Sequence, residues 1–149
     1  MSPSEVHVVK AADIQTSSSG QTDGRCNEIH STLRSTLTVT ESLQGMTRMP
    51  AITKLASICS SIMLAEPHSA SAVHHHGAQD TIVYAVRGQG AVVSEGGKKR
   101  QVLKQGDFAL IPAYQEHQEV NDGDEEVEWV IVRSGGEPEV VNLEGWGKS

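Results

Sequence analysis

The sequence predicts an all-β domain, and two observations support that prediction. Short runs rich in β-branched residues begin near residue 36 and recur at intervals of roughly 8–12 residues, with glycine-bearing turns between many of them. No segment of convincing length has the 3.6-residue periodicity of an amphipathic helix. Regularly spaced short strands are typical of a β-sandwich or barrel, so parallel strand–helix–strand units are not expected.

The expected strands follow one another along the chain. A β-branched segment covers 36–40, and after a turn region at 45–50 the segment 52–66 is interpreted as one strand, although its apolar spacing nearly fits a helix as well. Shorter strands are then expected at 81–86, 91–94, 100–103, 108–112, 117–121 and 127–132. The glycine turn at 88–90 is interpreted as a hairpin, because no strand-to-helix switch follows it that could bind a phosphate.

The chain divides into an arm and a body. Residues 1–35 are expected to form an N-terminal arm and a flexible loop, since 16–24 is small and polar. Residues 36–149 are expected to form a single barrel domain, because 149 residues make one domain of ordinary size. The arm carries apolar residues between Val6 and Ile14 that could form an edge strand against another subunit, so we expect a homodimer.

Composition and charge exclude several classes of partner. The chain has 12 basic and 19 acidic side chains and a formal charge of −7, which disfavours nucleic acid and anionic lipid. It has no apolar run of about 18 residues, the length that a membrane-spanning helix needs. Cys26 and Cys59 form no C-x-x-C pair, and the N-terminus carries no secretory signal, so a cytoplasmic protein without disulfides is expected.

Three consecutive histidines, His74, His75 and His76, are the strongest sign of chemistry. On a strand, His74 and His76 project to one side and His75 to the other, so the first two present two ring nitrogens to one point. His117, in the second glycine-turn-strand unit, is the candidate for a third nitrogen. Imidazoles bind iron, zinc, copper and nickel. The pattern therefore predicts a metal site, with an exposed strand of solvated histidines as the alternative.

The segments around these histidines resemble the two motifs of the cupin superfamily. HHHGAQDTIVYAVRG supplies the first motif with His74, His76 and Gly88. GDFALIPAYQEHQEVN supplies the second with Gly106, Pro112, His117 and Asn121, and it has Tyr114 where the family often has glycine. The resemblance implies a double-stranded β-helix, or jelly-roll, barrel that holds one divalent transition metal ion.

The first motif departs from the family at its metal-binding glutamate, where this chain has Thr81, a poor metal ligand. Three alternatives remain open: a site of three histidines alone, a fourth oxygen ligand from Gln79, or one from Asp80 through a local bulge. We favour three histidines, because open positions leave room for substrate or dioxygen. Glu119 lies two positions after His117 on the same strand face and is the predicted catalytic residue, as a general base or as a partner that orients an imidazole.

These features together indicate a metal-dependent protein that acts on a small organic molecule. The favoured hypothesis is an enzyme similar to the three-histidine iron dioxygenases among cupins. A non-redox lyase, isomerase or decarboxylase that uses zinc, nickel or manganese is the second hypothesis, and a non-catalytic metal or small-molecule binding module is the third. Copper is a further candidate metal. Arg48, in the turn region at 45–50, could reach over the barrel mouth and bind a carboxylate, but it is interpreted as solvated.

Overall fold

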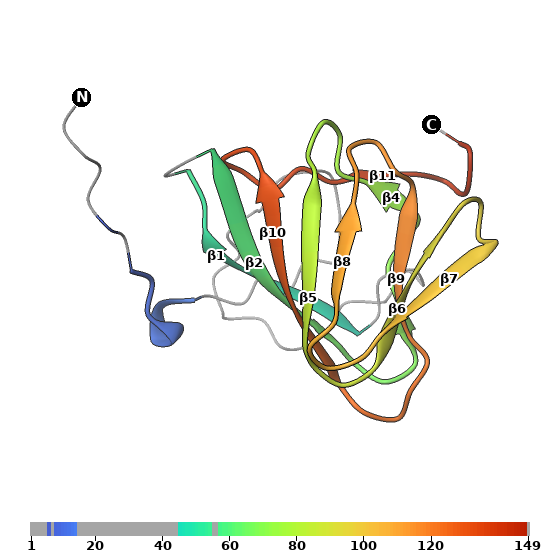
Figure 1. Ribbon diagram of the computed structural model, residues 1–149, viewed down its shortest axis with the longest axis horizontal. Helices are drawn as coiled ribbons and strands as arrows, with labels where there is room; N and C mark the ends of the chain where they lie inside the picture. Colours follow the sequence, from blue (N-terminus) through green and yellow to red (C-terminus); the bar gives the residue numbers. More distant parts are fainter. Residues whose placement is uncertain (1–5, 7, 15–44, 55–56, 149) are drawn as a thin grey trace, which may run out of the picture.

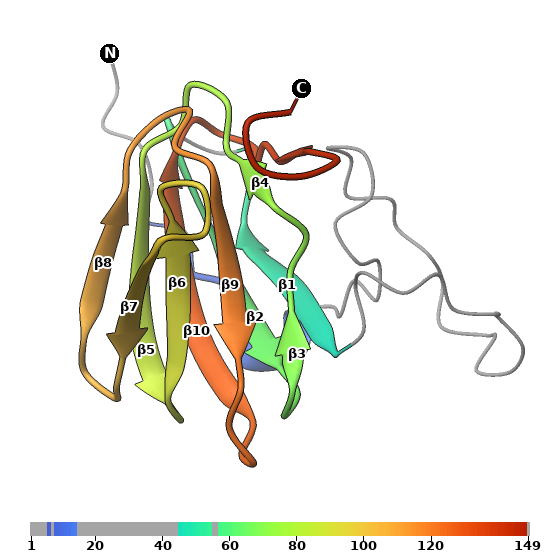
Figure 2. The same cartoon turned by 90° about the vertical axis from the view of Figure 1, so that its right-hand side faces the viewer.

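Two antiparallel sheets face each other in the computed structural model, which describes residues 6, 8–14, 45–54 and 57–148 (Figure 1 and Figure 2). The five-stranded sheet has the order β1-β2-β10-β5-β8. The six-stranded sheet has the order β11-β4-β9-β6-β7, and β3 also pairs with β9. The only helix among the described residues is a short 3₁₀ turn, so the all-β prediction is confirmed.

The strand bounds agree closely with the sequence from residue 81 onward. The first sheet contains β1 (Met46–Ile52), β2 (Ile58–Ala65), β5 (Thr81–Arg87), β8 (Phe108–Ile111) and β10 (Val127–Ser134). The second contains β3 (Ser69–Ala70), β4 (His74–His75), β6 (Gly90–Ser94), β7 (Lys99–Leu103), β9 (His117–Asn121) and β11 (Val141–Asn142). The short strands β3 and β11 were not predicted, because two residues carry no alternation pattern.

The prediction for 45–66 is wrong in two respects. The segment 52–66 is not one strand, because β1 ends at Ile52 and β2 begins at Ile58. The expected turn region at 45–50 is instead most of β1, which pairs with β2 and shifts register between Pro50 and Ile52. A proline cannot donate a ladder hydrogen bond, so it is tolerated at such an irregularity and disguises the strand in the sequence. The expected strand at 36–40 lies outside the described residues, as does the boundary at residue 35.

The described part of the N-terminal arm forms no strand. Its residues 11–13 make the 3₁₀ helix η1 (Ala11–Asp13), so residues 8–14 form no strand within one chain. Their pairing with an edge of another subunit stays a prediction. Val6 and Val8 are exposed. The homodimer stays a prediction, which light scattering at micromolar concentration would test. In the described part of the chain, no helix has the length and apolar character to cross a membrane.

The interior between the sheets changes from apolar to polar along the strands. On β10 the inward residues run in order from Val127 through Trp129 and Ile131 to Arg133, and all are buried. Across the ladder, Ala85 pairs with Trp129 and Thr81 pairs with Arg133. We call the end with Trp129 the apolar end. The buried apolar core also extends beside the polar positions, since Val92 pairs with Glu119 and Ile111 pairs with Thr81. Its members are Met63, Ala65, Val83, Ala85, Val92, Leu103, Ile111, Val127, Trp129 and Ile131.

The other residues of the two motifs fix the conformation of turns and loops. Gly88 has φ +75°, and a Cβ there would lie 2.7 Å from the carbonyl oxygen of Glu126, so glycine is required. Tyr114 has φ +60°, in the left-handed region that favours glycine, which explains why the family often has glycine at this place. The Asn121 amide donates to the carbonyl oxygens of Ala65, Glu66 and Glu125. Asn121 therefore ties together the loops at the apolar end.

Candidate metal centre

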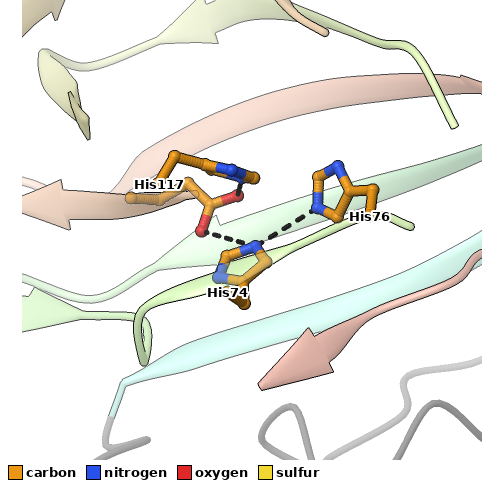
Figure 3. Close-up of side chains that lie close together, drawn as sticks. His74, His76 and His117 are labelled. Atoms are coloured by element: carbon orange, nitrogen blue, oxygen red, sulfur yellow. Dashed lines mark hydrogen bonds and ion pairs between the residues drawn. The ribbon is translucent and has the colours of Figure 1, made fainter. Parts of the chain in front are cut away.

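Strands β4 and β9 bring the predicted histidines together inside the barrel (Figure 3). His74 is the register partner of His117, and His76 follows β4 with its ring turned into the same interior. All three side chains are buried, and their ring centroids lie 4.2–5.0 Å apart. His75 projects to the other side, where its ring contacts Tyr114. The alternation predicted from the sequence is therefore what the structure has.

Each of the three rings is held by a hydrogen bond from its Nδ1 atom. His74 Nδ1 donates to the carbonyl oxygen of Ala72 (2.8 Å), and His117 Nδ1 donates to that of Gln115 (2.9 Å). His76 Nδ1 lies 2.6 Å from Oγ1 of Thr81, the residue that replaces the expected glutamate. A carbonyl oxygen can only accept, so in His74 and His117 the proton sits on Nδ1 and the lone pair on Nε2.

The three Nε2 atoms converge, and Glu119 joins them. One ligand atom from each of His74, His76, His117 and Glu119 lies within 4.8 Å of the others, and all four side chains are buried. Glu119 Oε2 is 3.5 Å from His74 Nε2, and Oε1 is 3.6 Å from His117 Nε2. Among the described residues, His117 Nε2 has no hydrogen-bond partner. We call these four residues the His₃Glu cluster.

Glu119 is fixed by contacts on both of its oxygens. Ser71 Oγ donates to Oε2 (2.7 Å) and accepts from the Glu119 backbone N–H (3.0 Å). Arg48 Nη2 lies 3.4 Å from Oε1. Arg48 was expected to be a solvated turn residue, and that expectation is wrong, because β1 carries its side chain into the barrel with only 14% exposed.

Neither of the two predicted fourth ligands reaches the cluster. The Gln79 amide donates to the Glu137 carbonyl (2.6 Å) and accepts from the Glu139 backbone N–H (2.8 Å), so it holds the C-terminal segment. Asp80 is exposed and accepts from the backbone N–H of Ala113 (3.0 Å). Because β5 begins at Thr81 without a bulge, Asp80 stays outside the barrel. Glu119 supplies the only carboxylate of the cluster.

Arg133 is a residue of this site that the sequence reasoning missed. It is 2% exposed, and its Nη2 donates to His76 Nε2 (3.1 Å). Its inward place at the end of β10 follows from the alternation of that strand. Its nearness to His76 depends on how the two sheets face each other, which no pattern within one strand can reveal.

Burial sets the protonation states of the cluster. It lowers the pKa of His74 and of His76 below the ordinary value of 6.5, and the charge of Arg133 lowers the pKa of His76 further. Burial alone would raise the pKa of Glu119, but that pKa lies well below the usual value, because a proton on Nε2 of His74 or His117 favours the ionised carboxylate. Neutral imidazoles and an ionised carboxylate are the forms that bind a metal.

Comparisons with known proteins agree with this fold. The family model described as the cupin domain matches residues 61–133. A sugar phosphate isomerase of the cupin superfamily from Silicibacter pomeroyi superposes with a TM-score of 0.62 at 21% identity, covering 86% of this chain and 75% of its own. An uncharacterized double-stranded β-helix protein from Klebsiella pneumoniae gives 0.61 at 23%, covering 71% and 90%.

An oxalate decarboxylase from Bacillus subtilis also has a similar fold. It superposes with a TM-score of 0.61 at 19% identity, covering 67% of this chain and 28% of its own. A second structure of the same enzyme comes from a study of its Mn(II) centres. No protein of curated function matches the chain. At these identities the structural likeness concerns the fold.

The fold and the buried histidines define a class, the double-stranded β-helix barrels, as the sequence predicted. Within that class the chain contains a cupin domain, and the resemblance stated from its two histidine motifs is confirmed.

Proposed function

We propose that this chain is a metal-dependent cupin enzyme that acts on a small organic molecule. His74, His76, His117 and Glu119 would hold one divalent transition metal ion. The observation that carries the proposal is the anchoring of all three Nδ1 atoms on protein oxygens, which directs three Nε2 atoms to one buried point. Hydrogen bonds of this kind orient metal-binding histidines in proteins generally.

The donor set fits manganese or iron well. Imidazole suits most first-row metals, and a carboxylate adds preference for harder ions such as Mn(II) and Fe(II). The Mn(II) centres of the structurally similar decarboxylase support this choice. When bound, such an ion polarises a coordinated substrate oxygen.

Glu119 serves this proposal better as a ligand than as a free general base. Ser71 donates to one oxygen, Arg48 lies near the other, and the pKa of the carboxyl is low. A carboxylate held so firmly in its ionised form is a weak proton acceptor. Its negative charge instead offsets part of the charge that an ion would bring into the buried interior.

The reaction class depends on the metal. The preference for an iron dioxygenase rested on a site of three histidines alone, and a Glu119 ligand removes that ground. Iron as the resident metal would support the dioxygenase hypothesis. Manganese, zinc or nickel would support a lyase, isomerase or decarboxylase. A protein that binds metal and turns over no substrate would be a binding module.

Elemental analysis of protein purified without added metal tests the proposal. We expect close to one equivalent of a single transition metal, and the same stoichiometry after removal with a chelator and titration with Mn²⁺. The Thr81→Val variant, which replaces only the hydroxyl next to His76 Nδ1 with a methyl group, should still bind Mn²⁺, with lower affinity. Wild-type protein that takes up no Mn²⁺, Fe²⁺ or Zn²⁺ would overturn the proposal.

A further inference from the structure

Arg133 lies beside the proposed metal site, in contact with His76. It ends the inward row of β10, and its register partners are Thr81 on β5 and Cys59 on β2. Its Nη2 donates to His76 Nε2, the same lone pair that the proposed metal would use. One lone pair cannot serve both groups. When a metal takes the lone pair of His76, the guanidinium must turn that N–H to another acceptor.

The charges near the cluster point to what that acceptor is. Two guanidinium groups reach the cluster, those of Arg48 and Arg133. Glu119 is the one buried carboxylate among the described residues. A divalent ion would add two further positive charges. Positive charges held close together in a buried site repel one another, so a negative ligand between Arg133 and the ion would stabilise the loaded site.

We propose that Arg133 is the specificity-determining residue of the site and binds the carboxylate of a small organic acid. The inference rests on the proposed function, because it places this acid beside the metal ion. The planar guanidinium fork matches a carboxylate with two parallel hydrogen bonds. The same fork also matches a phosphate, so inorganic phosphate is one of the probes of the test.

Calorimetric titration of the Mn²⁺-loaded protein tests the inference. The probes are glycolate, its neutral analogue glycolamide, and inorganic phosphate. The variants are Arg133→Gln and Arg133→Lys, and the control is Arg100→Gln, which removes an exposed guanidinium that pairs with Asp122 on the surface. Each variant is first analysed for bound Mn²⁺, so that loss of the metal is distinguished from loss of the anion.

We expect the wild type and the Arg100→Gln control to bind glycolate alike, and glycolamide and phosphate to bind more weakly. Arg133→Gln should weaken glycolate about 10- to 100-fold while keeping Mn²⁺, because a charge-assisted hydrogen bond is lost. Arg133→Lys keeps the charge without the fork, so its loss should be smaller. If the Arg133→Gln variant does not fold, the glycolate affinity of Arg133→Lys still tests the inference.

Three results would overturn the inference while leaving the metal centre intact: equal glycolate affinity in wild type and both Arg133 variants, glycolamide binding as tightly as glycolate, or phosphate binding more tightly than either. A wild type that binds none of Mn²⁺, Fe²⁺ and Zn²⁺ contradicts the proposed function itself, and the inference with it.

Discussion

The two ends of the barrel share the same strands, but one end buries apolar side chains and the other buries polar and charged ones. At the apolar end, Trp129 and Met63 are buried among aliphatic side chains. We call the opposite end, which holds the His₃Glu cluster and Arg133, the polar end. Arg133 lies there, four positions after Trp129 on β10, and its side chain is also buried, in contact with His76. The inward alternation of β10 is unbroken between Trp129 and Arg133.

This difference separates stability from function within one small domain. Burial of apolar surface stabilises the apolar end, at about 25 cal/mol per Å². The buried charges of the His₃Glu cluster and Arg133 gain less, because desolvation opposes their mutual attraction. The presence of these polar residues in the interior is therefore better explained by ligand binding than by a contribution to the stability of the fold.

The largest effect should come from Trp129→Ala at the apolar end. Truncation of a fully buried tryptophan leaves a cavity and should lower the free energy of unfolding by about 3–5 kcal/mol, measured by urea denaturation. The Mn²⁺ affinity of the protein that remains folded should stay the same. Trp146→Ala, which removes a half-buried indole, should cost much less. Similar losses for the two variants would contradict the assignment of Trp129 to the core that stabilises the fold.

Ser71→Ala should weaken the metal site through Glu119. The hydroxyl donates to Glu119 Oε2, and losing such an outer partner of a ligand typically costs about 10–100-fold in metal affinity. Competition with a coloured chelator would measure this loss. Ser60→Ala is the control, because Ser60 lies on β2 between the buried positions 59 and 61 and does not face the interior. Unchanged affinity in Ser71→Ala would show that Glu119 is not a ligand.

The metal-free protein should lose stability in mild acid. Burial lowers the pKa of His74 and His76 in the folded state, so below about pH 6.5 the unfolded chain binds more protons than the folded one. The free energy of unfolding should therefore be fully present above that pH and fall as the pH drops toward 5. Melting temperatures across this range would show it, and the His74→Gln/His76→Gln double variant should show a flatter profile.

Tyr114→Gly should have the smallest effect. Tyr114 occupies the left-handed region, which costs an ordinary residue about 1 kcal/mol, whereas glycine adopts it freely. The gain is offset by the greater freedom of glycine in the unfolded chain and by the lost contact with His75. A change in the free energy of unfolding within about 1 kcal/mol is expected, with no change in metal binding.

The fold and the histidines could be predicted because their signals are local. Alternation along a strand and the spacing of two motifs place His74, His76 and His117 on inward faces. Arg133 could not be assigned to the site, because its contact with His76 joins strands of opposite sheets, 57 residues apart in the chain. The inward face of Glu119 was predicted, but its closeness to His74 depends on the pairing of β4 with β9.

The most direct test of the central claim compares two histidines that differ in the face they occupy. His117→Ala removes a buried nitrogen of the His₃Glu cluster, whereas His75→Ala removes a ring on the opposite side of β4. Mn²⁺ titration of both variants should show affinity reduced by more than about 100-fold in the first, beyond the loss typical of an outer partner, and wild-type affinity in the second. Full metal binding in His117→Ala would contradict the account.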